Sequence, residues 1–206
     1  ERGRRLHASP RRGAGARGRG GPDFPLIYKM SADDGLPGGL TLAETPEIAT
    51  RLEAVGVAAV VASAGTYGSF GCIVQPVTDG DACLRRHAAV LKRALTIPVV
   101  AVGRITTPEV AEDILERGEA DLVALGRALL ADPDWPEKAR AGRPLDIRPC
   151  ITCNECLTRL FRVEAIRCAV NPELGREREF PAPRAAKPRR VVVVGGGPAG
   201  MQAAAV

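Results

Sequence analysis

From Phe24 onward, short apolar runs alternate with longer segments in which apolar residues recur every three or four positions. Four of the runs have the length of strands and lack the polar alternation of a half-exposed strand, so they predict strands that are buried on both faces. These predicted strands are Leu26–Met30, Ala58–Ala64, Val99–Val102 and Leu122–Leu125.

The segments between and after these runs carry the start and stop signals of helices. Thr45 is a candidate N-cap with Pro46 in the first turn behind it, and Gly118 follows the segment that Thr107 opens. The predicted helices are Glu44–Val55, Leu84–Leu95, Thr107–Arg117, a short one near Ala128–Leu130 and another at about Pro136–Ala141.

Buried strands that alternate with amphipathic helices predict an α/β fold with a parallel sheet covered by helices. The run before Gly103-Arg104 and the run before Gly126-Arg127 repeat the same strand–Gly–Arg unit 23 residues apart. Such a repeat fits a (β/α)8 TIM barrel as well as an open sheet. Because only four strands precede the cysteine-rich segment, the barrel reading predicts the carboxyl-terminal half of a barrel.

Changes in composition divide the chain into five parts. A disordered Arg/Gly-rich start comes first, and then a β/α region, a cysteine segment, a linker rich in Pro, Arg and Glu, and the beginning of a new domain. These parts are residues 1–22, 23–147, 148–172, 173–188 and 189–206.

The overall charge of +5 comes from the start of the chain. Residues 1–22 hold seven arginines and one glutamate, so the remainder carries −1. The body therefore offers no basic face for a nucleic acid, and an RNA-binding role would rest on residues 1–22 alone. There is no apolar run of membrane-spanning length, and six cysteines without an apolar export signal favour a reducing cytoplasm.

The strongest chemical signal is a set of four cysteines with the spacing C-x2-C-x2-C-x11-C, namely Cys150, Cys153, Cys156 and Cys168. A compact triplet with a distant fourth thiol is typical of iron–sulfur cluster ligands. Zinc is the alternative, although structural zinc sites more often use two separated pairs of ligands. Disulfides are less favoured in a chain without an export signal.

A second signal is the pattern G-x-G-x-x-G at Gly195, Gly197 and Gly200, after the apolar run Val191–Val194. The first glycine permits a tight turn, the second lets the backbone approach a pyrophosphate, and the third allows close packing of helix on strand. The pattern predicts the first β-α unit of a Rossmann-like, dinucleotide-binding domain, with a Gly-rich turn as the alternative.

Gly103-Arg104 and Gly126-Arg127 each follow a predicted strand, at the strand end where barrel enzymes bind phosphate. Glycine lets backbone N–H groups come close to an anion, and arginine adds charge-assisted hydrogen bonds. The alternative is that the arginines are surface residues paired with acids. Lys29 ends a strand predicted to be buried, so it should point into a site or meet a partner such as Asp33.

Together these motifs resemble those of a known family. The residues that carry the resemblance are Phe24–Asp33, Val102–Glu109, Leu125–Pro133, Arg148–Asn154, Cys168–Pro172 and the glycine fingerprint. In order and spacing they are similar to the NADH:flavin oxidoreductases of the 2,4-dienoyl-CoA reductase and enoate reductase group, multidomain relatives of old yellow enzyme. The resemblance covers about Gly21 to Val206.

The resemblance implies a barrel that binds FMN, with Lys29 near the flavin pyrimidine edge and with Gly103, Arg104, Gly126 and Arg127 at the phosphate. It further implies that the four cysteines ligate a [4Fe-4S] cluster and that the glycine fingerprint begins an FAD- and NAD(P)-binding domain. In such enzymes electrons pass from NAD(P)H through FAD and the cluster to FMN, which reduces an activated C=C bond of an enone or enoyl-CoA.

Measured against that family, the chain is expected to be a fragment or a frameshifted reading frame. The first half of the barrel and most of the FAD domain are missing, and with them the tyrosine expected to donate the substrate proton. No catalytic residue is therefore assigned, and little turnover is expected of the chain alone. The alternative is a non-catalytic zinc- or cluster-binding module.

Overall fold

The computed structural model describes Gly15 and residues 23–180, 186–187 and 189–205. Within these ranges four strands form a parallel sheet in the order β1-β2-β3-β4, which confirms the predicted α/β class. The strands are β1 (Ile27–Ser31), β2 (Ala59–Ser63), β3 (Val99–Ala101) and β4 (Leu122–Val123). The predicted disorder of residues 1–22 lies, apart from Gly15, outside the described residues.

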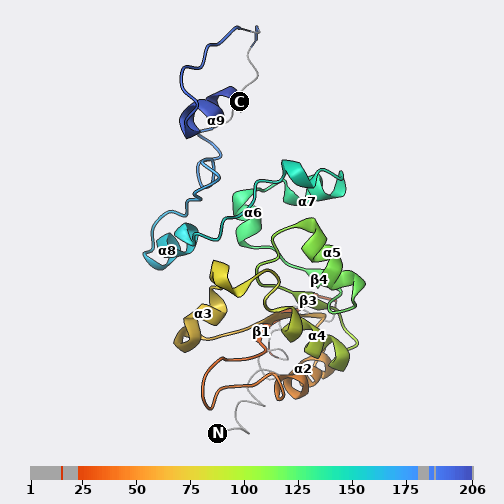
Figure 1. Ribbon diagram of the computed structural model, residues 1–206. Helices are drawn as coiled ribbons and strands as arrows, with labels where there is room; N and C mark the ends of the chain where they lie inside the picture. Colours follow the sequence, from red (N-terminus) through yellow and green to blue (C-terminus); the bar gives the residue numbers. More distant parts are fainter. Residues whose placement is uncertain (1–14, 16–22, 181–185, 188, 206) are drawn as a thin grey trace.

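Figure 1 shows the helices that follow the strands along the chain. All five predicted helices are observed, and each differs from its prediction by one residue at either end. The helices are α2 (Thr45–Ala54), α3 (Phe70–Ile73), α4 (Arg85–Ala94), α5 (Pro108–Glu116), α6 (Arg127–Ala131), α7 (Trp135–Arg140), α8 (Glu155–Phe161) and α9 (Pro198–Ala205). Short 3-10 turns lie at Tyr67–Ser69, Val77–Asp79 and Pro144–Asp146.

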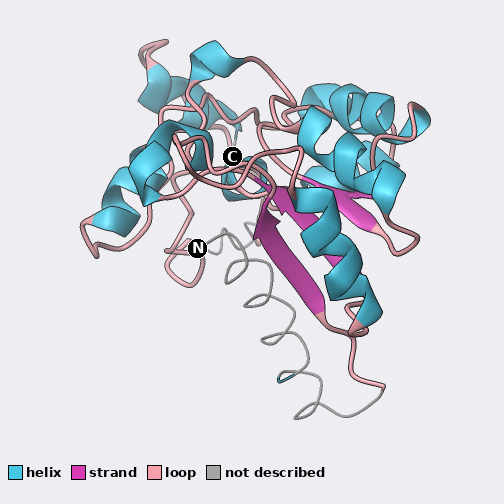
Figure 2. Ribbon diagram, turned by 90° about the horizontal axis from the view of Figure 1, so that it is seen from below, coloured by secondary structure: helices cyan, strands magenta, loops and turns pink. Residues whose placement is uncertain are grey.

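One face of the sheet packs against the helices (Figure 2). Val60 and Val99 lie on this face and are fully buried against Leu52 of α2, Leu91 of α4 and Ile114 of α5. Burial of these large aliphatic side chains supplies the main stabilisation, at about 1.5–3 kcal/mol for each side chain.

The opposite face of the sheet is not covered by helices in the part of the chain that the structure describes. Lys29 pairs in register with Val61 on this face, Ile27 is 62% exposed, and Leu122 is 52% exposed. The prediction of strands buried on both faces is therefore wrong for these residues. A strand that lines the inside of a barrel has the same apolar pattern as one covered by helices, so sequence alone does not separate the two cases.

Two local predictions also need correction. Thr45 is not the N-cap of α2, because Glu44 holds that position and the Thr45 hydroxyl donates a 3.0 Å hydrogen bond to the Ala32 carbonyl. Val191–Val194 do not form a strand, although α9 follows them as predicted. No strand among the described residues pairs with this segment, and an extended segment without a hydrogen-bonding neighbour is not stable as a sheet.

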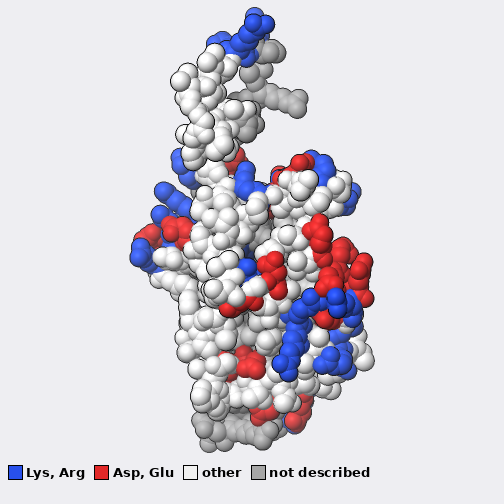
Figure 3. All heavy atoms as spheres, viewed as in Figure 1, with Lys and Arg blue, Asp and Glu red and all other residues white. Residues whose placement is uncertain are grey.

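Ion pairs connect the outer surfaces of α4 and α5, where basic and acidic side chains lie side by side (Figure 3). Arg85 contacts both Asp113 and Glu119, and the hydrogen bond to Glu119 is the main cause that raises the pKa of Arg85. Arg117 also pairs with Asp113. The two ion pairs of Arg85 fix α5 and the turn after it against α4 but, being partly solvated, contribute modestly to stability.

Among the described helices, none combines the length and the apolar character that crossing a membrane requires.

Candidate functional site

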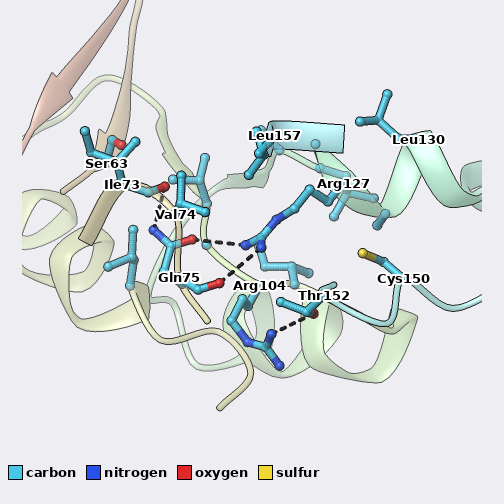
Figure 4. Close-up of a pocket in the computed structure, with 18 of the residues that line it drawn as sticks. Ser63, Ile73, Val74, Gln75, Arg104, Arg127, Leu130, Cys150, Thr152 and Leu157 are labelled. Carbon is cyan, nitrogen blue, oxygen red and sulfur yellow. Dashed lines mark hydrogen bonds between the residues drawn. The ribbon is translucent and has the colours of Figure 1, made fainter. Parts of the chain in front are cut away.

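A pocket of about 620 Å³ lies on the helix-free face, at the carboxyl-terminal edge of the sheet. Its wall includes Lys29 of β1, Val61 and Ser63 of β2, and the loops after β3 and β4, because parallel strands end at one edge of the sheet. It brings together all five positions that the sequence singled out in the sheet region: Lys29, Gly103, Arg104, Gly126 and Arg127. Cys150 also lines it (Figure 4).

Arg104 is held in place by three hydrogen bonds. Its Nε donates to the Gly80 carbonyl at 2.6 Å, its Nη1 to the Thr152 hydroxyl at 2.7 Å, and its Nη2 to Asp81 at 3.3 Å. The side chain is only 7% exposed, and the backbone has a φ of 53°. A non-glycine residue in this left-handed region is uncommon, and the surrounding contacts are what sustain it.

Arg127, the first residue of α6, approaches the same pocket from the end of β4. Its Nη1 donates to the Gln75 carbonyl at 3.1 Å and to Asn154 Oδ1 at 2.5 Å, and its Nη2 donates to Gln75 Oε1 at 3.4 Å. Figure 4 shows Gln75 beside this guanidinium. Pairing with an acid, the predicted alternative, is seen for Arg104, which contacts Asp81, whereas Arg127 contacts Gln75 and Asn154. Asp132 pairs with Lys138.

The two glycines before these arginines differ in their surroundings. Gly103 has a φ of 99°, and a Cβ added to it would lie 2.7 Å from Leu84 Cγ, so the position requires glycine. A Cβ on Gly126 would meet no atom within 4 Å among the described residues. Gly126 therefore leaves its backbone open to the pocket.

One wall of the pocket is apolar and comes from the cysteine segment. Leu157, Leu160 and Phe161 of α8 line it, and the Phe161 ring packs edge-on against Phe70 of α3 at 5.0 Å between centroids. A planar aromatic ligand would find an apolar surface here.

The four cysteines of this segment are free thiols, of which Cys156 is buried and Cys153 is exposed. Across the described ranges, no three His, Cys, Asp or Glu side chains are arranged to hold a metal ion. Burial raises the pKa of the Cys156 thiol, and the charges of Cys150, Cys168 and Cys153 also raise it. Four thiols are, by their chemistry, the donor set of an iron–sulfur cluster or of a four-cysteine zinc site.

Buried polar groups anchor both ends of the cysteine segment to the α6–α7 region. Asp132, which is 2% exposed, accepts hydrogen bonds from Lys138 Nζ at 2.6 Å and from the Arg148 N–H at 2.8 Å. Asn171, which is 5% exposed, donates to the Leu130 carbonyl at 3.0 Å. The segment is therefore fixed against the pocket just before Cys150 and just after Cys168.

The glycine fingerprint lies apart from this pocket, beside α9 (Figure 1). Gly195 has a φ of 113°, and a Cβ on Gly200 would clash with the Gly195 carbonyl oxygen. A Cβ on Gly197 meets nothing within 4 Å in the described chain. The tight turn, the open backbone and the close packing therefore fall at the three positions where the motif predicts them.

Sequence reasoning missed three polar residues of the site. Gln75 is 6% exposed and contacts Arg127, while Thr152 and Asn154 sit between the cysteines. Thr152 and Asn154 could have been predicted as site residues, because the cysteines on either side of them were already predicted to be cluster ligands. Gln75 gave no signal, since its contacts form only when α3 folds against α6.

A second pocket of about 720 Å³ lies behind Gln75 and is lined by Cys72, Cys83 and His87 among others. Burial raises the pKa of Cys83 and lowers that of His87, so both groups are held neutral. All three residues are half-buried.

A parallel α/β sheet with paired Gly-Arg turns at its carboxyl edge is the arrangement of an enzyme that binds a phosphorylated cofactor. The model of the NADH:flavin oxidoreductase / NADH oxidase family matches residues 17–146. The chain belongs to this family, which confirms the resemblance drawn from its motifs.

Individual relatives agree with this assignment. The NADH oxidase of Thermoanaerobacter brockii is 46% identical over 187 residues, which is 89% of this chain and 29% of that protein. The cinnamate reductase of Clostridium sporogenes is 34% identical over 201 residues, covering 90% of this chain and 30% of that protein. The structure of a 2-naphthoyl-CoA reductase complex matches with a TM-score of 0.87 at 32% identity, over 96% of this chain and 31% of that one. The chain thus spans about three-tenths of the length of these relatives.

Proposed function

We propose that this chain is the FMN-phosphate and iron–sulfur portion of an oxidoreductase that reduces an activated C=C bond. The observation that carries the proposal is the pocket in which Lys29, Arg104, Arg127 and Cys150 meet. It places two arginines, one lysine and a predicted cluster ligand around a space of about 620 Å³, which is an ordinary size for a cofactor site.

The polar end of this pocket suits a phosphate. Each guanidinium offers five N–H donors, and Arg104 and Arg127 enter from two adjacent strand ends. Gly103 and Gly126 would let backbone groups approach the same anion. The residues therefore fit the 5′-phosphate of FMN, and charge-assisted hydrogen bonds to it would be among the stronger contacts that the site offers.

The remainder of the pocket suits a flavin ring. Leu157 and Phe161 give an apolar wall, and Lys29 puts a cation on the sheet side. FMN supplies hydride chemistry when it is bound. Lys29 would stabilise the negative charge of a reduced ring by Coulomb attraction.

The cysteine segment is proposed to hold a [4Fe-4S] cluster through Cys150, Cys153, Cys156 and Cys168. The donor set fits, since such a cluster needs four thiolates, and Cys150 lines the proposed flavin pocket. A cluster of this kind carries single electrons. The chain's own contribution is to fix the segment beside the pocket, through Asp132 and Asn171.

The remaining assignments concern the longer protein. The one-sided sheet, with its helix-free face lined by Lys29 and Val61, supports the carboxyl-terminal half of a (β/α)8 barrel. The turn geometry of Gly195 and Gly200 supports the start of an FAD- and NAD(P)-binding domain. NAD(P)H is then the electron donor, and the substrate is a small enone, enoate or enoyl-CoA, a class consistent with relatives named cinnamate reductase and 2-naphthoyl-CoA reductase.

Titration of the full 206-residue chain with FMN, followed by quenching of flavin fluorescence, tests the proposal. Riboflavin, which lacks the phosphate, is the matched ligand. The proposal predicts saturable binding of FMN that is at least about tenfold tighter than that of riboflavin, since hydrogen bonds to a charged group contribute about 1.5–3 kcal/mol each. Equal affinities would refute the phosphate site.

A further inference from the structure

Thr152 and Asn154 alternate with the first three cysteines, and both have left-handed backbone, with φ of 55° and 58°. Asparagine adopts this region fairly readily, but a β-branched threonine does so rarely. Such strain persists where surrounding contacts hold it in place. At both residues the side chain makes a contact that can do so.

Each of the two side chains accepts a hydrogen bond from a different arginine of the pocket. Arg104 Nη1 donates to Thr152 Oγ1 at 2.7 Å, and Arg127 Nη1 donates to Asn154 Oδ1 at 2.5 Å. These contacts join residues 48 and 27 positions apart in sequence. They connect the ends of β3 and β4 to the loop that carries Cys150, Cys153 and Cys156.

We propose that Thr152 and Asn154 are positioning residues that hold Arg104 and Arg127 ready for the phosphate of FMN. Through the same two contacts, occupancy of the phosphate site is coupled to the conformation of the cysteine loop. The inference rests on the proposed function and deepens it, because it assigns a role to two residues that are not among the proposed cluster ligands.

Arg104 and Arg127 can each bind a phosphate while they keep their hydrogen bonds to the cysteine loop. With its contacts to described residues, each guanidinium uses three of its five N–H donors, so two remain on each for an incoming anion. An arginine that is already held loses less conformational entropy when a ligand binds. Coupling of this kind is reciprocal, so an ordered cysteine loop favours FMN and bound FMN favours an ordered loop.

Three variants of the full chain separate positioning from folding. Thr152→Val removes the hydroxyl but keeps the shape, Thr152→Ser keeps the hydroxyl, and Asn154→Gly removes the amide while tolerating the left-handed backbone. The readout is the ratio of FMN affinity to riboflavin affinity. Damage to the pocket as a whole lowers both affinities, whereas loss of a held arginine lowers only that for FMN.

The expected result is a fall of about 2- to 10-fold in this ratio for Thr152→Val and for Asn154→Gly, from the cost of ordering one arginine. Thr152→Ser should retain the wild-type ratio. Thr50→Val is the matched control, because Thr50 lies on α2 and its hydroxyl bonds to the Pro46 carbonyl within the same helix. It should leave both affinities unchanged.

The coupling itself is measured at Cys153, the exposed thiol of the loop. In the full chain, reduced and freed of metal by chelation, FMN should slow alkylation of Cys153 by iodoacetamide, and riboflavin should not. In the double variant Thr152→Val/Asn154→Gly, saturating FMN should give no protection. The six thiols are followed separately by peptide mass spectrometry, with Cys72 and Cys83 as internal references.

The outcomes distinguish the two levels of the account. If the wild-type chain binds FMN no more tightly than riboflavin, both the phosphate site and its coupling are refuted. If the wild-type chain prefers FMN but the variants keep that preference, or if Cys153 is not protected by FMN, the proposed function stands and the positioning role of Thr152 and Asn154 is refuted.

Discussion

The Asp132 carboxylate accepts a 2.8 Å hydrogen bond from the backbone N–H of Arg148, two residues before the first cysteine of the ligand loop. The same carboxylate pairs with Lys138 on α7 and is almost fully buried. Asp132 thus ties the turn after α6 to the start of the cysteine segment. Its ionised form is what makes this connection strong.

Replacing Asp132 with Asn should destabilise the chain by about 1–3 kcal/mol, because Lys138 loses its charged partner and a buried acceptor is weakened. Thermal unfolding measures this. Asp146→Asn is the matched control, since Asp146 pairs with Arg143 on the exposed turn after α7 and should change stability little. An equal effect of both substitutions would contradict the role given to Asp132.

The contribution of Asp132 should depend on pH. Burial alone would raise the pKa of Asp132, but hydrogen bonds from Lys138, Arg148 and Asp134 outweigh it and hold this pKa below its ordinary value. Because the folded pKa is lowered, the contribution is complete above the ordinary pKa of about 4 and is lost as the pH falls through the folded value. Wild type and Asp132→Asn should therefore differ in unfolding free energy at pH 7 and converge in acid. If the difference in unfolding free energy between wild type and Asp132→Asn grew as the pH fell, the pKa of Asp132 would be raised and not lowered by folding.

Gly103→Ala should cost about 1–3 kcal/mol, because the φ of 99° disfavours any Cβ and Leu84 occupies the space that it would need. Gly71→Ala on α3 is the matched control, since no described atom lies within 4 Å of its added Cβ. Urea titrations of the two variants should separate clearly. A Gly103→Ala variant as stable as Gly71→Ala would contradict the structure of the loop after β3.

Arg127→Gln should weaken FMN binding about 10- to 100-fold and leave riboflavin binding largely unchanged, because the phosphate is the only part of FMN to which the guanidinium is assigned. Arg140→Gln on the exposed side of α7 removes the same charge without touching the pocket. It should not alter either affinity. Should the two variants weaken FMN equally, the effect of Arg127 would be one of net charge and not of a specific contact.

Lys29→Met should make the reduction potential of bound FMN more negative by about 20–60 mV, because loss of one nearby cation removes about 1–3 kcal/mol of stabilisation from the reduced ring. FMN affinity in the oxidised state should change much less. Lys92→Met, on α4 and paired with Asp121, is the control. An unchanged potential in Lys29→Met would remove the lysine from the proposed flavin chemistry.

The sheet and its helices followed from periodicity, since each strand and each long helix has an apolar pattern that burial enforces. The open face of the sheet could not be predicted. Apolar residues such as Ile27 and Val61 are expected on this face whether helices cover it or it lines the inside of a barrel. Helix α8 escaped prediction as well. It spans seven residues, too few for a clear period, and it is stabilised by the contact of Phe161 with Phe70.

The candidate site was partly predictable for a related reason. A Gly-Arg pair directly after a predicted strand indicates phosphate binding from the sequence alone, so Arg104 and Arg127 were predicted as site residues. Their hydrogen bonds to Thr152 and Asn154 depend on how the cysteine segment folds back over the sheet. That path is set by tertiary contacts such as the one between Asp132 and Arg148, and local sequence does not encode it.

The central claim is that the four cysteines hold a redox cluster beside a flavin pocket. Anaerobic purification of the full chain, followed by its visible spectrum and by iron, sulfide and zinc analysis, tests it most directly. The account predicts about four irons and four sulfides per chain, and their loss in Cys153→Ser but not in Cys72→Ser. Zinc in place of iron, or the same metal content in Cys153→Ser as in wild type, would contradict it.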